Sequence, residues 1–121
     1  MLLMLAGLAA EIRAAFDPCA WLVLDGAQLV GLLSLTATPT GGTITIGYGI
    51  APSEQGRGAA TGAVAALLEW ARSDVRVRLI EAETGTGNLA SQRALHRNGF
   101  AIVGERTDDE DGALFCWRSA C

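Results

Sequence analysis

The stretch of this sequence best suited to chemistry is a glycine-bearing turn at residues 55–60, between an expected strand and an expected helix. A run rich in β-branched residues ends at Ile50, Pro52 turns the chain, and glycine occupies positions 56 and 58. The first N–H groups of a helix lack partners inside it, and the helix dipole makes that end positive. Because the glycines carry no side chains, a diphosphate could approach these groups directly. The turn is neither a Walker loop nor a G-x-G-x-x-G fingerprint. By itself it indicates either an anion site or a simple strand-to-helix corner.

A second polar segment, "NLASQRALHRNGF" at residues 88–100, follows the next expected strand. Together with the turn it resembles the GCN5-related N-acetyltransferase (GNAT) superfamily, in particular the branch that includes the ribosomal-protein N-terminal acetyltransferases. The phrases "IGYGIAP" and "EAETGTGN" fit the same branch, and the resemblance covers residues 20–118. The residues that carry it are Gln55, Gly58 and Ala60 in the turn and Asn88, Ser91, Asn98, Gly99 and Phe100 in the second segment.

The resemblance implies that acetyl-CoA is the acyl donor. In this family the turn holds the pyrophosphate through backbone N–H groups, and the pantetheine arm lies like an extra strand between two separating strands. Glycine suits a strand on which a ligand lies, because no side chain is in the way. Asn88 would bond an amide of the arm, and Ser91 would lie near the sulfur. The expected donor-binding residues are Gly49, Ile50, Gln55, Gly56, Arg57, Gly58, Ala59, Ala60, Thr61, Asn88 and Ser91.

The implied reaction is direct attack of a neutral amine on the thioester carbonyl, which needs a proton acceptor, an oxyanion donor and a proton donor. The backbone N–H of Ile50 is the expected oxyanion donor. Many relatives have a tyrosine as general acid where this chain has Leu95, and the ribosomal-protein branch has a glutamate where it has Thr45. The serine of that branch is present as Ser91, which is the first catalytic candidate. Glu83 is the second, as a base, with a water chain or solvent as the other means of removing the proton.

Several polar residues have simpler explanations. Tyr48 shares a strand face with isoleucines and is expected in the core with its hydroxyl in contact with water. His96 is expected to be solvated, and Glu81 and Glu83 could simply pair with Arg76 or Arg78. The acidic turn at residues 108–112 is expected to be solvated, although four carboxylates near an acceptor pocket would attract a cationic amine.

These residues need a fold that brings the two motifs together. The patterns predict a helix at 1–16, two strands joined at Asp25-Gly26, a strand at 43–50, a helix at 56–73 and a strand at 75–84. A short helix at 89–99 and two closing strands around residues 108–112 follow. Val64, Leu67, Leu68 and Ala71 are the expected buried stripe of the longer helix. The expected class is α+β, a GNAT fold whose mixed, mostly antiparallel sheet is splayed at the acetyl-CoA site, with helices on both faces.

Composition narrows the function further. The 121 residues fit one domain, 1–121, and half of them are hydrophobic. The chain has no lysine and a net charge of −4, which disfavours nucleic acid and anionic membranes as partners. One histidine and three cysteines without a C-x-x-C pair predict no metal site. Reduced thiols in a cytoplasmic protein are the expected state of the cysteines.

The N-terminus raises a separate expectation. Its apolar run is too short to span a bilayer and lacks the basic start of a signal peptide. Compared with the superfamily, the usual first strand and part of the early helical region are expected to be missing or reduced. The leucines and methionines there would suit a homodimer contact.

The sequence therefore predicts an N-acetyltransferase that moves an acetyl group from acetyl-CoA to a primary amine. The acceptor is a small molecule or a peptide: a protein N-terminus, a polyamine, an aminoglycoside or another small amine. The alternative is a CoA-binding domain with little or no catalysis that acts as a sensor or interaction module. A phosphate-binding domain unrelated to CoA leaves Asn88 and Ser91 unexplained.

Overall fold

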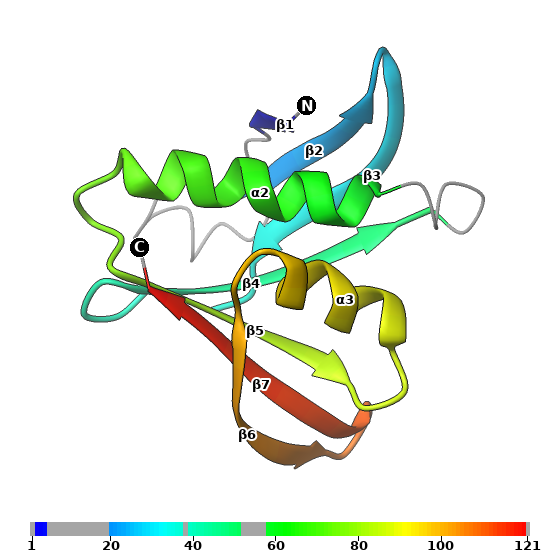
Figure 1. The fold of residues 1–121 in the computed structure, drawn as a ribbon, viewed down its shortest axis with the longest axis vertical. Coiled ribbons are helices and arrows are strands. Elements are labelled where there is room, and N and C mark those ends of the chain that lie inside the picture. The colour runs from blue at the N-terminus through cyan, green and yellow to red at the C-terminus, as the bar shows by residue number, and fades with distance from the viewer. Residues whose placement is uncertain (1, 5–19, 38, 52–57, 121) are drawn as a thin grey trace.

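The computed structural model describes residues 2–4, 20–37, 39–51 and 58–120 of the chain. They form a seven-stranded sheet with two helices (Figure 1), in the strand order β1-β2-β3-β4-β5-β7-β6. Neither of these helices is long and apolar enough to cross a membrane. The elements are β1 Leu2–Met4, β2 Ala20–Asp25, β3 Gln28–Leu35, β4 Thr43–Ile50, α2 Ala59–Arg72, β5 Leu79–Gly85, α3 Leu89–Arg97, β6 Ala101–Asp108 and β7 Gly112–Ala120.

The sheet is mixed and mostly antiparallel, as the sequence predicts. Among the described strands only β4 and β5 run parallel to each other, and α2 connects them as the crossover that a parallel pair needs. The tight turns lie where the turn residues predict them. Gly26 (φ 61°) joins β2 to β3, and Gly112 (φ 74°) follows the acidic turn as the first residue of β7. Both need the left-handed backbone that glycine adopts without a steric cost.

The core lies between α2 and one face of the sheet. The stripe predicted for the helix, Val64, Leu67, Leu68 and Ala71, is buried. It belongs to a single apolar cluster with residues of β2, β3, β4 and β5. The second helix, α3, contacts α2 and lies in front of the same sheet face in Figure 1. The fully buried members of largest volume are Leu33, Ile44, Ile46, Leu67, Ile80, Leu95, Val30 and Val64.

The first residues form a strand where a helix was predicted. Residues 2–4 pair antiparallel with residues 21–23 of β2 and so extend the sheet by one short strand. The helix prediction was wrong for these residues. A run of a few apolar residues has no periodicity that distinguishes a helix from a strand. Residues 5–16 of the predicted helix lie outside the described residues, as does most of the segment expected to form a dimer contact.

The sheet splits along its parallel pair. Pairing between β4 and β5 stops at Ile46 opposite Ala82. Beyond that point β4 stays paired with β3 as far as Ile50, and β5 stays paired with β7 as far as Gly85. Figure 1 shows the two strands diverging toward their C-terminal ends, with α3 beside them. Each strand therefore has one edge that faces away from its remaining partner and toward the split.

Replacing Leu67 by alanine is expected to lower the free energy of unfolding by about 2–5 kcal/mol, because its neighbours would relax only partly into the space it leaves. Equilibrium unfolding in urea measures the change. Leu29→Ala is the control, since Leu29 is 57% exposed and Leu67 is fully buried; the control is expected to change stability by less than about 0.5 kcal/mol. Equal stabilities of the two variants would contradict this core.

Candidate active site

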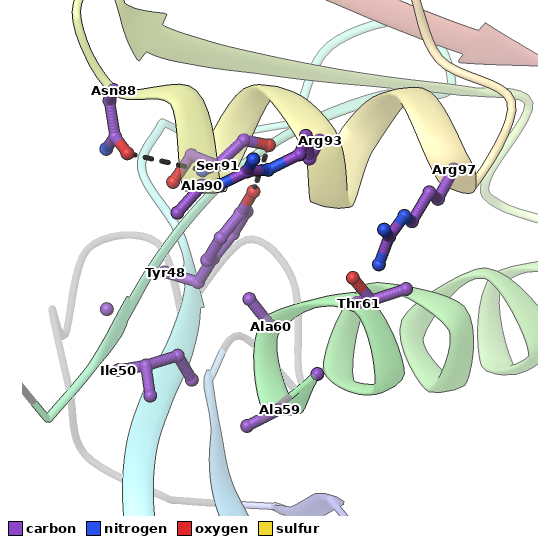
Figure 2. Close-up of a pocket in the computed structure, with 12 residues that line it drawn as sticks. Tyr48, Ile50, Ala59, Ala60, Thr61, Asn88, Ala90, Ser91, Arg93 and Arg97 are labelled. Carbon is purple, nitrogen blue, oxygen red and sulfur yellow. Dashed lines mark hydrogen bonds between the residues drawn. The ribbon is translucent and has the colours of Figure 1, made fainter. Parts of the chain in front are cut away.

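A cavity of about 350 Å³ lies where the end of β4, the first turn of α2 and one face of α3 meet (Figure 2). Three separate chain segments supply its walls, so the site exists only in the folded protein. The described residues that line it are Tyr48, Gly49, Ile50, Gly58, Ala59, Ala60, Thr61, Asn88, Ala90, Ser91, Arg93 and Arg97.

The first turn of α2 presents backbone N–H groups to the cavity. Gly58 caps the helix with a left-handed backbone (φ 79°, ψ 8°), without a side-chain hydrogen bond to the cap, and no acidic residue lies in the first turn. The helical bonds begin with the N–H of Gly62, which donates to the Gly58 carbonyl at 2.9 Å. The N–H groups of residues 59–61 therefore have no acceptor within the helix. Together with the helix dipole they make this wall attractive to an anion.

The glycines of β4 have different structural roles. A Cβ on Gly47 would lie 2.7 Å from Thr36 Cγ2, so the Thr36 side chain would have to shift to admit one. A Cβ on Gly49 would meet nothing within 4 Å, and Gly49 lines the cavity. A ligand can therefore approach the strand backbone at Gly49, next to Ile50. At Gly47 the side chain of Thr36 covers the backbone.

Asn88 caps α3 inside the site. Its side-chain oxygen accepts a hydrogen bond from the N–H of Ser91 at 3.2 Å (Figure 2), which satisfies one of the unpartnered donors of that helix. No described residue accepts a hydrogen bond from the carboxamide N–H₂ group of Asn88, so this group can donate to a ligand. Asn88 thus has a structural use that the sequence comparison did not predict, and it fixes the position of Ser91.

Tyr48 joins β4 to α3 across the cavity. Its hydroxyl donates a hydrogen bond to the backbone carbonyl of Ser91 at 3.2 Å (Figure 2). Burial raises the pKa of the Tyr48 hydroxyl above its usual value, so the group is neutral at pH 7. The predicted core position is only partly right, because the ring packs against the core and also lines the cavity.

A second link holds α3 against the start of α2. The side-chain amide of Asn98 donates to the Thr61 carbonyl at 3.1 Å and to the Ala94 carbonyl at 2.8 Å. Gly99 follows with φ 83° and ends the helix as predicted. Asn98, one of the residues that carry the family resemblance in the sequence, also sets the spacing between two walls of the cavity.

Arg93 and Arg97 line the cavity and were not among the expected site residues. They lie four residues apart on α3, and Ala90 shares their face, because residues at this spacing lie above one another on a helix. The spacing places both on one face of α3, and only the packing of α3 against α2 makes that face a wall of the cavity. Figure 2 shows Arg97 pointing across toward Thr61 in the first turn of α2. None of the described residues that line the cavity is acidic.

Glu83, the expected base, is not among the described lining residues. Its carboxylate is in an ion pair with Arg106, with 2.9 Å between Arg106 Nη2 and Glu83 Oε1. This pairing raises the pKa of the Arg106 guanidinium above its usual value. The thiol of Cys116, opposite Glu83 in the register of β5 and β7, lies 3.9 Å from the other carboxylate oxygen.

The partners predicted for Glu81 and Glu83 were wrong. Glu81 pairs with Arg118 at 2.9 Å, because the antiparallel register places these two residues opposite each other. Arg76 precedes the strand and pairs with Asp74 at 2.7 Å.

The remaining expected positions divide into two groups. Gln55, Gly56 and Arg57 lie outside the described residues, so the expected pyrophosphate turn is described from Gly58 onward. Leu95, at the position of the family's general acid, is fully buried in the core. Its burial explains why the position carries an apolar residue. The described lining residues that carry a hydroxyl group are Tyr48, Thr61 and Ser91.

The described walls fit a ligand with an anionic end and an extended neutral arm. The anionic end would face the N–H groups of α2 and two arginines, and the arm would have open backbone at Gly49 and an amide donor at Asn88. CoA thioesters have this distribution of groups. The fit rests on the open space at Gly49 and on the absence of acidic residues among the described lining residues.

Comparison with known proteins agrees with this geometry. A family model described as the acetyltransferase (GNAT) domain matches residues 5–101. No curated protein sequence matches the chain. Among solved structures, the chain is similar to Mycobacterium smegmatis RimJ in complex with CoA-disulfide, with a TM-score of 0.78 and 22% identity over 99% of this chain and 69% of that one.

Two further solved structures have the same fold. The ribosomal L7/L12 alpha-N-protein acetyltransferase RimL, in complex with CoA, gives a TM-score of 0.76 and 22% identity over 84% of this chain and 60% of that one. The AAC(6')-Ib structure with ribostamycin and CoA gives 0.73 and 20% over 91% of this chain and 68% of that one. With the fold shared and the family model covering most of its length, the chain belongs to the GNAT acetyltransferases.

Proposed function

We propose that this acetyltransferase binds acetyl-CoA in the cavity between β4, α2 and α3 and transfers the acetyl group to a primary amine. The observation that carries the proposal is the placement of an open helix N-terminus next to the point where β4 leaves β5. An anion-binding wall and a strand edge that can accept an extended arm then lie in one cavity. The family match supplies the class of reaction.

The donor would be held by backbone groups at one end and side chains at the other. The N–H groups of residues 59–61 would hold the pyrophosphate, with Gly58 allowing close approach and the Thr61 hydroxyl available beside them. Gln55, Gly56 and Arg57 would complete this turn. Gly49 and Ile50 would lie along the pantetheine arm, and the amide N–H₂ group of Asn88 would donate to one of its carbonyl groups.

Acetyl-CoA supplies an activated thioester carbonyl, and the residues of the chain supply orientation and proton handling. Ser91 is the proposed proton donor, because its hydroxyl lies in the cavity wall and its backbone is fixed twice, by Asn88 and by Tyr48. These two bonds restrict where the hydroxyl can point. Tyr48 is neutral and donates to Ser91, so we assign it a positioning role.

Glu83 has a less direct part in the proposal. Arg106 holds its carboxylate, so proton removal by Glu83 requires Arg106 to release or share it. A water chain or solvent is the other means of removing the proton. The buried Leu95 and this occupied carboxylate favour the alternative function, CoA binding with little or no catalysis. Thiol release from acetyl-CoA in the presence of amines separates the two functions.

The acceptor class follows from charge. The chain carries a net charge of −4, and the turn between β6 and β7 is acidic. Within this turn Asp108 accepts the N–H groups of Glu110 and Asp111, which lowers the pKa of Asp108 and keeps it ionised. Aminoglycosides, polyamines and peptide N-termini are the amines to assay. The similar structures include an aminoglycoside complex and an alpha-N-protein acetyltransferase.

Ser91→Ala is expected to reduce kcat by about a hundredfold, because loss of a positioned proton donor costs on the order of 10²–10⁴ in rate. CoA affinity is expected to change less than about twofold, since the backbone contacts of Ser91 remain. Thiol release and calorimetry measure the two quantities. Ser119→Ala on β7 is the control. Unchanged turnover in Ser91→Ala would remove Ser91 from the mechanism.

Gly58→Glu is expected to weaken CoA binding by at least about a hundredfold, because it places a carboxylate next to the proposed pyrophosphate position. Gly26→Glu is the matched control, since both glycines have positive φ and a Cβ at either position would meet no atom within 4 Å. Backbone strain then appears in both variants and charge repulsion in one. Calorimetry with CoA gives the affinities, and normal binding by Gly58→Glu would show that the turn is not the pyrophosphate site.

A further inference from the structure

We infer that Gln92 is a positioning residue for the transfer reaction. Together with Tyr48 it connects the two diverging strands through the first turn of α3, and this connection sets where the Ser91 hydroxyl lies. These contacts are named the Tyr48–Gln92 bridge below. The inference rests on the proposed function and goes further, because it gives a role in the reaction to a side chain that is not among the described lining residues of the cavity.

Gln92 ties α3 to the end of β5. Its side-chain amide donates hydrogen bonds to the carbonyl groups of Gly85 and Thr86, at 3.0 Å each. Gly85 is the last residue of β5, and Thr86 follows it in the loop that leads to α3. A carboxamide nitrogen carries two N–H groups. The two contacts therefore use both of them, and one side chain holds two consecutive carbonyl groups.

The loop at residues 85–87 needs such a contact. It reads Gly-Thr-Gly, and glycine loses more conformational freedom on folding than any other residue. The Gly85 carbonyl also accepts the N–H of Asn88 at 3.0 Å, so both of its lone pairs are used within the protein. The N–H of Thr86 donates to the Ala113 carbonyl on β7 at 3.2 Å. The loop is thus held from the sheet on one side and from α3 on the other.

The preceding residue of α3 is tied to the other strand. Tyr48 of β4 donates its hydroxyl to the Ser91 carbonyl at 3.2 Å (Figure 2), and Gln92 is the next residue along the helix. Pairing between β4 and β5 stops at Ile46 opposite Ala82, before Tyr48 is reached. Two consecutive residues of α3 therefore connect the strands at a level where strand pairing does not.

The position of Ser91 depends on both ends of the bridge. If either contact is lost, the first turn of α3 can move toward the strand that still holds it. A displacement of about 1 Å at a reacting group can reduce the rate about a hundredfold. The first turn of α2, which faces the phosphates in the proposed function, is held to α3 by Asn98 instead. Loss of the Gln92 contacts is therefore expected to affect the reaction step more than donor binding.

The first test compares Gln92→Met with His96→Met. Methionine has a similar length to glutamine and no donor group, so the change removes both hydrogen bonds and keeps most of the packing. His96 lies one turn further along α3, is exposed and is not among the described lining residues, so it controls for a new methionine on this helix.

Gln92→Met is expected to lower kcat about tenfold and to change the KM for acetyl-CoA less than about threefold. His96→Met is expected to leave both within about twofold. Gln92→Glu is expected to lower kcat further than Gln92→Met, because its carboxylate would face two carbonyl oxygens. Thiol release gives the kinetic constants, and thermal unfolding of each variant verifies that the fold is kept.

The second test asks whether Tyr48 and Gln92 act as one unit. Tyr48→Phe removes only the hydroxyl and is also expected to lower kcat about tenfold. The variant with both Tyr48→Phe and Gln92→Met is expected to be at most about twofold slower than the slower single variant, because a bridge released at one end no longer fixes the helix. A product of the two single effects, about a hundredfold, would show independent roles and overturn the bridge.

The third test does not depend on catalysis. Hydrogen exchange followed by mass spectrometry is expected to be at least about tenfold faster over residues 85–92 in Gln92→Met than in the unmodified protein, and unchanged in His96→Met. Equal exchange in the two variants would overturn the bridge as a structural element.

Two kinetic results would overturn the positioning role while leaving the proposed function in place. One is a kcat for Gln92→Met equal to that of His96→Met. The other is a higher KM for acetyl-CoA with kcat unchanged, which would make Gln92 a support for donor binding alone. An unmodified protein that releases no thiol with any of the amines would overturn the proposed function itself, and hydrogen exchange would still decide whether the bridge holds α3.

Discussion

The interruption of backbone pairing between β4 and β5 after Ile46 and Ala82 is the constraint on which the site depends. Backbone N–H and carbonyl groups at a strand edge need hydrogen-bond partners. The diverging edges of β4 and β5 are too far apart to bond to each other. An extended ligand can bond to them instead, in the way that peptides add to exposed strands. The pairing of β4 with β3 and of β5 with β7 keeps the two diverging strands in place. On one side, β3 lies so close to β4 that a Cβ on Gly31 would overlap the Gly49 carbonyl. On the other side Thr84 is buried and accepts a hydrogen bond from Trp117 at 2.9 Å.

The helices complete the site through polar contacts that cross between elements. Tyr48 fixes the start of α3 to β4, and Asn98 fixes its end to α2. Apolar packing alone permits small shifts of one helix over another, whereas a hydrogen bond between specified atoms does not. Because α3 is held at both ends, its inner face keeps Ser91 and the two arginines at set distances from α2. The same residues thus stabilise the fold and define the dimensions of the cavity.

Local signals in the sequence predicted most of the elements. Gly26 and Gly99 marked their turns because positive φ is a property of single residues, and the α2 stripe followed from helical periodicity. The sequence did not predict features that depend on contacts between distant segments. These are the ion-pair partner of Glu81, which follows from strand register, and the hydrogen bonds made by Tyr48 and Asn98. Arg93 and Arg97 were missed for the same reason, since only the packing of α3 on α2 turns an ordinary exposed helix face into a cavity wall.

The hydrogen bond between Tyr48 and Ser91 also gives the protein a built-in reporter. Tyr48 is the only tyrosine in the sequence, and its ring lies in the wall of the cavity. In a sample labelled on tyrosine, magnetic resonance would therefore record a single ring, without the assignment work that several tyrosines require. Its chemical shift would respond to any molecule that enters the cavity and to any movement of α3 relative to β4. Occupancy of the site and the position of the helix can thus be followed in solution on the unmodified chain.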